Sequence, residues 1–327
     1  VTFNTIYAIL LLNIILSILI MKGDLILKND GYIDLHIHSN VSDGKMSVES
    51  IMELARTNNM RTIAFSEHYN MGSYNLAKIL AADDIEVIPA VEIGASLSSF
   101  GISKKHVCHV IAYYPSYMIC NILDEYEKSR ETCVKKTLKK LQKSIPLSYR
   151  DVVKYARNKS SIGRFDIAVA LYKKGYAKSP VAAYGQFLEL GKVCYVEREK
   201  IDIVDLIKRI RKINGVPIIA HPKSMKLNFD DTFNLLYKLK ECGLEGLEVY
   251  NPCNTIAQRE EFLMLCRYFD LLPTCGSDFH GMQGRLVNIG TGINNNLCIS
   301  DYSIIQDLKR RQNAIFCENH NKKGCKE

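Results

Sequence analysis

The 327-residue sequence lacks internal repeats, low-complexity tracts and any pair of cysteines spaced as CxxC. With no biased tract and 47% hydrophobic residues, a disordered chain is excluded and a substantial buried core is predicted. The 11 cysteines lie far apart in a chain too large to need disulfide staples, so we interpret them as reduced thiols. The length suits one large domain with an insertion, or two domains.

A clustered basic surface is also missing from the sequence. The net charge is +8, but the lysines are scattered and are not interleaved with aromatic residues. The excess suits an anionic ligand in general. It indicates neither duplex DNA nor a stable protein partner.

A long apolar run is absent as well, because the run from Ile6 to Ile20 has about 15 residues and spanning a bilayer takes ~20. The run has no basic leader before it and no small-residue cleavage site after it, which argues against secretion. We interpret residues 1–30 as an apolar extension. It either lies upstream of a true start at Met21 or is a weak membrane anchor, and we predict a cytoplasmic protein.

From Tyr32 onward, short β-branched or apolar runs alternate with stretches of helical spacing, the βα rhythm typical of a parallel barrel or sheet. Strands are predicted at Tyr32–Ile37, Thr62–Ser66, Glu86–Val91, His106–Ala112, Val216–Ala220, Leu244–Val249 and Leu271–Gly276. Helices are predicted at Ser47–Thr57, Asn75–Ala82, Phe229–Cys242 and Ile256–Tyr268.

The rhythm breaks between about residues 116 and 200, where Asp124–Gln142 and Arg164–Lys174 have charged helical patterns. We predict a helical insertion over 116–200 that acts as a substrate lid. The barrel then occupies 31–115 and 201–317. Residues 318–327 are predicted to form a polar, frayed tail.

Ionisable residues stand at or near the ends of six predicted strands: His36, His38, Glu67, His68, Glu92, His109, His221, Asp278 and His280. The carboxyl ends of parallel barrel strands converge on the face where active sites lie. His36 and His38 lie on the same side of their strand, and Asp278 and His280 repeat that spacing. A single histidine is more often an ordinary side chain, and we interpret His106 and His320 in this way.

Imidazole and carboxylate ligands together suit divalent ions such as Zn, Mn or Fe, and a carboxylate can bridge two of them. Two ions ~3.5 to 4 Å apart convert a shared water to hydroxide and stabilise an in-line displacement at phosphorus. The constellation therefore predicts a metal-dependent phosphoesterase.

These motifs resemble those of the PHP (polymerase and histidinol phosphatase) family, in the family's order, over about Tyr32 to Gly281. The matching segments are Asp34–Ser39 with Ser42–Gly44, Ser66–His68, Val91–Ile93 with His109, Ala220–Pro222, and Gly276–His280. The resemblance implies an α/β fold, a distorted (β/α)7 TIM-like barrel, with up to three metal ions at its C-terminal mouth.

The resemblance also implies a ligand set, in which the first metal takes His36, His38, Glu92 and Asp278. Glu92 would bridge to a second metal, held also by His109 and a residue of the insertion, and a third metal would take Asp43, His68 and His280. His221 would contact the substrate phosphate or the bridging water. Two or three divalent ions are expected, with Mn favoured and Fe, Zn or Mg as alternatives.

Ser161–Ala168 and the following Leu171–Tyr195 resemble the insertion of one branch of this family. That branch removes the 3′-phosphate from 3′,5′-bisphosphonucleotides and, in some members, trims RNA from the 5′ end. Asp166 stands where the branch has a histidine ligand, and a carboxylate there favours Mn or Mg over Zn. Arg164 is the expected phosphate anchor.

Arg130 and Lys135 are weaker anchor candidates. Glu67 replaces the family's more frequent aspartate and is expected beside the ligands.

The leading prediction is a hydrolase of a small nucleotide phosphate, with short RNA 5′ ends as the other expected substrate. Three alternatives remain open: a histidinol-phosphate or other small phosphomonoester phosphatase, a 5′-3′ exoribonuclease, and a degenerate barrel that binds without catalysis. The Gly163–Ala168 pattern argues against the first. The scattered lysines neither favour nor exclude the exoribonuclease. The nearly complete ligand set argues against the degenerate barrel.

Overall fold

The computed structural model describes residues 31–102, 106, 108–156, 159, 162–282 and 286–324. The apolar extension with Met21, and also Ser161, lie outside these described residues. Within the described ranges, no helix combines the length and apolar character needed to cross a membrane.

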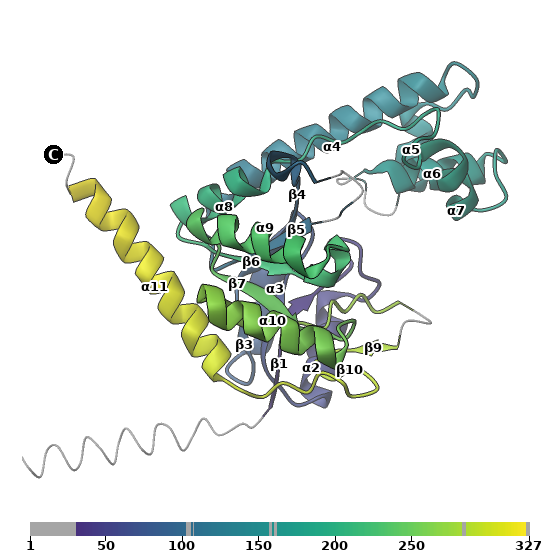
Figure 1. Ribbon diagram of the computed structural model, residues 1–327. Coiled ribbons are helices and arrows are strands. Elements are labelled where there is room, and N and C mark those ends of the chain that lie inside the picture. Colours follow the sequence, from purple (N-terminus) through teal and green to yellow (C-terminus); the bar gives the residue numbers. More distant parts are fainter. Residues whose placement is uncertain are drawn as a thin grey trace, which may run out of the picture.

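The strands form a mixed α/β fold with two main sheets (Figure 1). The first sheet is parallel and has the order β1 (Tyr32–Ile37), β2 (Met60–Phe65) and β3 (Glu86–Val87). The second has the order β4 (Ala90–Ala95), β5 (Cys108–Tyr113), β6 (Val216–Ala220), β7 (Gly246–Tyr250) and β8 (Leu272–Cys275). A short antiparallel ribbon, β9 (Val287–Asn288) and β10 (Gly292–Ile293), follows.

The expectation of uniformly parallel strands is wrong at β5, which is antiparallel to both β4 and β6. Parallel neighbours need a crossover of about a dozen residues or more, usually containing a helix. Between β4 and β5, the described residues contain only the short 3-10 turn Ser98–Phe100. The chain therefore returns directly beside β4 in the opposite direction.

The strand predicted at Glu86–Val91 is in fact two strands, β3 and β4, which belong to different sheets. Pro89 lies between them and has no N–H to donate to a sheet ladder. The chain changes sheets at this proline.

Backbone hydrogen bonds join the two sheets at one end. Glu92 N donates to Glu67 O at 3.0 Å, and Tyr69 N donates to Glu92 O at 3.0 Å. On the other flank, Asp278 N donates to His36 O at 2.9 Å and His38 N donates to Phe279 O at 2.9 Å. These bonds bring the ends of β1, β2, β4 and β8 together.

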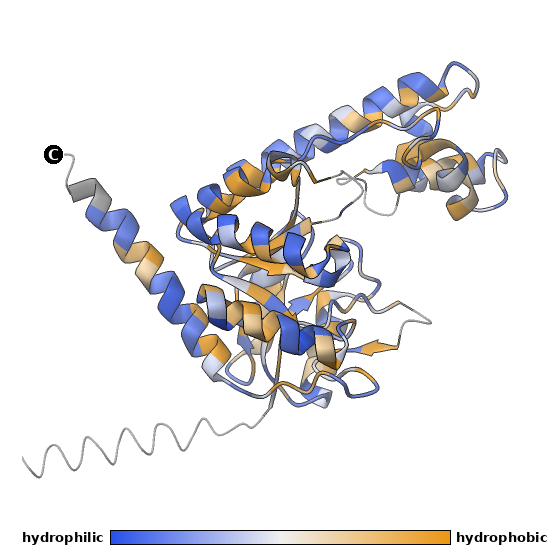
Figure 2. Cartoon of the chain, in the orientation of Figure 1, coloured by the Kyte–Doolittle hydropathy of each residue, from blue (hydrophilic) through white to orange (hydrophobic). Residues whose placement is uncertain are grey.

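Helices cover the sheets, and most of them begin at a residue whose side chain caps the helix. They are α2 (Val48–Thr57), α3 (Gly72–Ala81), α8 (Ile203–Lys212), α9 (Phe229–Glu241) and α10 (Ile256–Phe269). Asp202 accepts from Val204 N at the start of α8, whose buried side recurs at Ile203, Leu206, Ile207 and Ile210. Figure 2 shows the strands as mainly hydrophobic and the outer sides of the helices as hydrophilic.

Residues 116–200 contain helices, as the charged patterns predict: α4 (Ile119–Leu141), α5 (Tyr149–Tyr155), α6 (Arg164–Lys173) and α7 (Pro180–Ala183), followed by a π-helical turn at Tyr184–Leu188. The distal half of α4 projects from the sheets, and α5 to α7 pack beneath it (Figure 1). Leu138, Val152, Ile167 and Leu171 are buried in a separate hydrophobic cluster there.

The prediction of a frayed tail is wrong, because α11 (Ser303–Gly324) continues through most of it. Ile305 and Leu308 bury the start of this helix against the sheet. Further along, Glu318 pairs with Arg211 at 2.7 Å and Asn319 Nδ2 donates to Arg211 O at 2.7 Å. These long-range contacts, invisible to local composition, hold the polar segment.

Candidate metal centre

His109 reaches the other candidate ligands because β5 is antiparallel. His109 pairs in register with Gly94 of β4 and Ala220 of β6, near the carboxyl ends of those strands. The amino end of β5 therefore lies at the same edge. Gly94 is required beside it, because a Cβ there would lie 2.6 Å from the Tyr69 hydroxyl and 3.3 Å from His109 Cδ2.

The first group of converging ligand atoms comprises His36, His38, Glu92 and Asp278. The two imidazole Nε2 atoms lie 3.0 Å apart, and Glu92 Oε2 lies 3.4 Å from each of them. Asp278 Oδ1 lies 3.6 Å from His36 Nε2 and 3.3 Å from His38 Nε2. A tetrahedral ion with bonds of ~2.1 Å sets its ligand atoms about 3.4 Å apart. His36, His38 and Asp278 form one group that could hold such an ion, and Glu92 Oε2 faces both of its imidazoles.

The second group lies on the opposite oxygen of Glu92. Glu92 Oε1 is 2.9 Å from His109 Nδ1 and 2.8 Å from His221 Nε2, and these two nitrogens are 3.3 Å apart. His68 Nδ1 approaches the first oxygen, Oε2, at 3.0 Å. Each oxygen of one buried carboxylate thus faces its own set of imidazoles, the arrangement needed for a bridging ligand.

The third group surrounds Asp43, a half-exposed residue. Asp43 Oδ1 lies 3.3 Å from His280 Nε2 and 3.7 Å from His38 Nδ1, while Oδ2 lies 3.8 Å from His68 Nε2. His68 faces Glu92 with one ring nitrogen and Asp43 with the other. It can therefore serve either the second or the third group.

Glu92 Oε2 and His68 Nδ1 are buried and lie 3.0 Å apart without hydrogen-bond geometry, and neither has another hydrogen-bond partner among the described residues. A buried polar atom of this kind is rare in a folded protein and calls for an explanation. Imidazole and carboxylate atoms at these separations provide one, since they form a suitable donor set for a divalent metal. The residues present therefore fit divalent ions.

The electrostatics of the cluster favour an ionised Glu92 and a protonated His68. Burial raises the pKa of Glu92, but the facing imidazoles of His109, His68 and His36 outweigh it and hold this pKa well below its usual range. Burial lowers the pKa of His68, but the Glu92 carboxylate raises this pKa by more, so that it reaches about 9. Metal ions and these protons compete for the same nitrogens.

Glu248, on β7, was missed in the sequence. Its Oε1 lies 2.9 Å from His36 Nδ1, and its Oε2 accepts a hydrogen bond from His221 N at 2.6 Å. A carboxylate on one ring nitrogen fixes the tautomer that leaves Nε2 free for a metal. The available signal was a charged residue inside an otherwise apolar strand, away from the strand ends where the other candidate residues stand.

Glu67 and Asp34 are bound by protein groups. Glu67 Oε1 accepts from Ser39 N at 3.0 Å and from the Ser73 hydroxyl at 2.5 Å, and its other oxygen accepts from the Ser42 hydroxyl. Asp34 accepts from Ser277 N at 2.9 Å and from Gly290 N at 2.9 Å. These carboxylates organise the loops that carry the ligands.

The structure places Arg164 and Asp166 at the start of α6 and does not bring Asp166 into any of the ligand groups found among the described residues. Asp166 Oδ2 accepts from Gly163 N at 2.8 Å and so caps the helix. Arg164 Nη1 donates to Val196 O at 3.3 Å. Lys135 pairs with Glu131 at 2.7 Å on an exposed face of α4.

Comparison with known proteins shows which family this chain belongs to. The PHP domain model matches residues 34–216, more than half of the chain. The chain is 24% identical over 263 residues to a phosphoribosyl 1,2-cyclic phosphate 1,2-diphosphodiesterase of Eggerthella lenta, covering 79% of this chain and 97% of the relative. It is 28% identical over 249 residues to a 5′-3′ exoribonuclease of Haemophilus influenzae, covering 76% and 89%.

A third relative is a 3′,5′-nucleoside bisphosphate phosphatase of Chromobacterium violaceum, 23% identical over 261 residues, with 77% of this chain and 89% of the relative covered. The fold is similar to the solved structure of an amidohydrolase from Chromobacterium violaceum, with a TM-score of 0.67, 22% identity and coverage of 86% of this chain and 96% of that one. It is also similar to a structure from Bifidobacterium adolescentis, with a TM-score of 0.66, 23% identity and coverage of 85% and 96%. The chain therefore belongs to the PHP domain family, as its motifs predicted.

Proposed function

We propose that this protein is a metal-dependent phosphoesterase that hydrolyses a phosphate ester of a small nucleotide, of the 3′,5′-bisphosphonucleotide type. The observation that carries the proposal is Glu92, whose two oxygens face separate imidazole sets at 2.8 to 3.4 Å. Relatives that act on nucleotide bisphosphates and on RNA support this substrate class. We also propose that the two sheets form the distorted (β/α)7 barrel of the family.

We assign one ion to His36, His38, Glu92 and Asp278, and a second to Glu92 and His109. The third assignment is Asp43, His68 and His280. When bound, divalent ions supply Lewis acidity that activates a water and neutralises charge on the phosphoryl group. Mn suits this mixed nitrogen and oxygen set, with Fe, Zn or Mg as alternatives.

His221 acts directly on the substrate in this proposal. Its backbone has φ 27°, a strained conformation for a residue with a side chain, and Glu248 and the Ser224 hydroxyl hold it there at 2.6 and 2.9 Å. Burial lowers the pKa of His221, but its contact with Glu92 raises it above the ordinary value. If metal ions took the Glu92 oxygen that faces it, the Nε2–H of His221 would be free to donate to a phosphate oxygen or to protonate the departing alkoxide.

Phosphate release with Mn added tests this function. The substrates are adenosine 3′,5′-bisphosphate, histidinol phosphate and a 5′-phosphorylated oligonucleotide. Activity on the bisphosphate is expected, with its loss in Asp278→Asn. Glu131→Gln, in an exposed ion pair on α4, is the matched control and should keep full activity. Full activity in Asp278→Asn would show that the assigned site is wrong.

A 5′-3′ exoribonuclease is the second candidate, and one surface feature favours it. Lys136, Lys139, Lys140 and Lys143 line one groove of about 390 Å³ together with Tyr195. A basic groove with an aromatic ring suits a single nucleic-acid strand. A rate on the oligonucleotide far above that on the bisphosphate, together with a loss in Lys139→Gln, would favour the exoribonuclease.

A further inference from the structure

The outer edge of β4 is closed by different partners along its length. β4 lies at the end of its sheet, so alternate residues direct their backbone N–H and C=O groups away from β5. At Glu92 these groups bond to backbone atoms of residues 67–69 at 3.0 Å, and at Ser96 they bond to backbone atoms of residues 201–203 at 2.9 Å. Between the two, the backbone groups of Gly94 are bound by side chains.

Two tyrosine hydroxyls occupy this gap in the ladder. Gly94 N donates to the Tyr69 hydroxyl at 3.2 Å, and the Tyr126 hydroxyl donates to Gly94 O at 2.6 Å. The centroids of the two tyrosine rings are 4.8 Å apart. Because buried backbone groups need hydrogen-bond partners, the hydroxyls take the place of a neighbouring strand. They do so two residues after Glu92, the central carboxylate of the metal centre.

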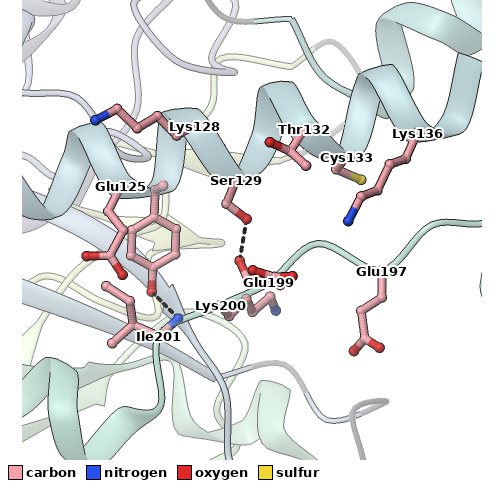
Figure 3. A pocket seen from close by; sticks show the side chains of 11 residues that line it. Glu125, Lys128, Ser129, Thr132, Cys133, Lys136, Glu197, Glu199, Lys200 and Ile201 are labelled. Atoms are coloured by element: carbon pink, nitrogen blue, oxygen red, sulfur yellow. Dashed lines mark hydrogen bonds between the residues drawn. The ribbon is translucent and has the colours of Figure 1, made fainter.

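Tyr126 belongs to α4, the helix that leads into the insertion. The first half of α4 packs in the main hydrophobic core, and its second half packs in the separate cluster of the insertion. The Tyr126 hydroxyl also accepts a hydrogen bond from Ile201 N at 3.3 Å, on the segment that returns from the insertion. Beside this bond, the Ser129 hydroxyl donates to Glu199 O at 2.7 Å, and all four residues line a cavity of about 360 Å³ (Figure 3). One hydroxyl thus ties both ends of the insertion to β4.

Tyr69 connects the same contact to a candidate metal ligand. It directly follows His68, and the centroids of their two rings are 6.0 Å apart. Its backbone has φ 54°, a left-handed conformation that is uncommon for a residue with a side chain and persists only where surrounding contacts hold it. Its N–H is one of those that bond to Glu92 O. A displacement of Tyr69 would therefore move His68 and Glu92 together.

Packing alone does not require a hydroxyl on the ring of Tyr126. The residue is 1% exposed, and phenylalanine would fill the same space without the oxygen. Burial raises the pKa of Tyr126, so the hydroxyl keeps its proton and remains a donor to Gly94 O. Burying a hydroxyl is costly unless it is hydrogen-bonded, and this one makes two hydrogen bonds. The hydroxyl therefore acts on β4 and on the base of the insertion.

We propose that Tyr126 is a positioning residue of the metal centre: through Gly94 and Tyr69, it sets the positions of the ligands assigned to the second ion. Those ligands are Glu92, on the same strand as Gly94, and His109, which pairs in register with Gly94. This inference rests on the proposed function, because it takes the assigned ligands as given. It goes beyond that function by giving the base of the insertion a part in assembling the metal centre.

Calorimetric titration of chelator-treated protein with Mn tests this inference. Tyr126→Phe keeps the ring and removes both hydrogen bonds of the hydroxyl. We expect the affinity for one ion to fall by roughly 3- to 10-fold, as the loss of a neutral hydrogen bond implies, while the other ions bind as in the wild type. Tyr302→Phe, which removes a hydroxyl that donates to Glu86 at 2.8 Å, is the matched control and should bind Mn like the wild type. Unchanged Mn binding in Tyr126→Phe would overturn the inference.

Two variant backgrounds separate positioning from a general loss of stability. In His109→Gln the site of the second ion is already damaged, so adding Tyr126→Phe should weaken Mn binding no further. In Asp278→Asn, which impairs the first site, adding Tyr126→Phe should cause the same loss as in the wild type. Equal losses in both backgrounds would overturn the inference. Tyr69→Phe removes the other hydroxyl at Gly94 and replaces Tyr126→Phe if that variant fails to fold.

Hydrogen exchange in the metal-free protein separates this inference from the proposed function. The amide of Tyr69, which donates to Glu92 O, should exchange at least about threefold faster in Tyr126→Phe than in the wild type, while the amides of α10 should not change. If the wild type bound no Mn, the proposed function would fail, and this exchange difference alone would decide the inference. Equal exchange at Tyr69 in both proteins would overturn it.

Discussion

Glu248 holds His36 in place through a 2.9 Å contact between its Oε1 and the imidazole Nδ1, and both residues are fully buried. The second oxygen of Glu248 receives the backbone N–H of His221 at 2.6 Å. One carboxylate outside the ligand groups thus orients a metal ligand and the residue proposed to contact the substrate.

Glu248→Gln tests this relationship. The amide keeps the shape of the side chain but removes the charge that makes the His36 imidazole a stronger ligand. We expect Mn affinity to fall by roughly 10- to 100-fold, measured by calorimetry on chelator-treated protein. Unchanged affinity would contradict the assignment. Glu131→Gln, an equivalent change on exposed α4, should leave the affinity unchanged.

Glu92→Gln addresses the bridging role of the central carboxylate. Because its two oxygens face separate imidazole sets, the amide should weaken metal retention in both. Metal analysis of the purified variant should show at least one ion per chain fewer than the wild type. Asp43→Asn, which touches only the third group, should lose less metal. The reverse order would rule out a bridging Glu92.

The raised pKa of His68 predicts how metal-free stability depends on pH. Burial lowers this pKa, but Glu92 and Asp43 raise it from the ordinary 6.5 to about 9. The stabilising contribution of protonated His68 is therefore complete below pH 6.5 and disappears as the pH rises through 9. The melting temperature of chelator-treated protein should fall across this window, and Mn affinity should rise.

His68→Gln is the control for this titration, because glutamine cannot carry the proton. Its melting temperature should fall less steeply over the same pH range. Parallel curves for the variant and the wild type would show that His68 does not cause the dependence.

Gly94→Ala tests the close packing between β4, Tyr69 and His109. The added Cβ would lie 2.6 Å from the Tyr69 hydroxyl and 3.3 Å from His109 Cδ2. Either neighbour must move, so we expect a loss of about 1 to 3 kcal/mol in the free energy of unfolding and a marked drop in activity.

Gly185→Ala provides the comparison for this substitution. The nearest atom to its added Cβ is Glu189 Oε2 at 3.8 Å, an ordinary contact. Its free energy of unfolding should stay within about 0.5 kcal/mol of the wild type. If Gly94→Ala behaves in the same way, the packing argument fails.

Two substitutions test whether Asp166 caps α6 or binds a metal ion. Asn can still accept the hydrogen bond from Gly163 N, so Asp166→Asn should retain stability, while Asp166→Ala should lose about 1 kcal/mol of helix capping. We expect both variants to retain the metal content of the wild type. Loss of one ion per chain in Asp166→Asn would make Asp166 the ligand that the insertion contributes.

Much of this site follows from local pattern. His36 and His38 share one side of β1 because strand side chains alternate, and this can be predicted without knowing the neighbouring strand. The motifs occur in the order of the PHP family, and the family model confirms that membership. The helical spacing of α9 and α10 likewise reflects periodicity within single segments.

Strand direction could not be predicted in this way. The sequence of β5 fits a parallel or an antiparallel strand equally well, and only hydrogen bonds to β4 and β6 show that His109 enters the site from the start of its strand. The helix at 318–324 likewise depends on contacts with Arg211, far away in sequence.

The residue types and spacings in the chain were therefore enough to indicate a multinuclear metal site and its family. Tertiary structure alone placed Glu248 behind His36 and His109 beside Gly94 of β4. The physical reason is that a ligand motif is written within a few consecutive residues, whereas the groups that orient ligands and recognise substrate come from distant segments. Only long-range packing and hydrogen bonding bring those segments together.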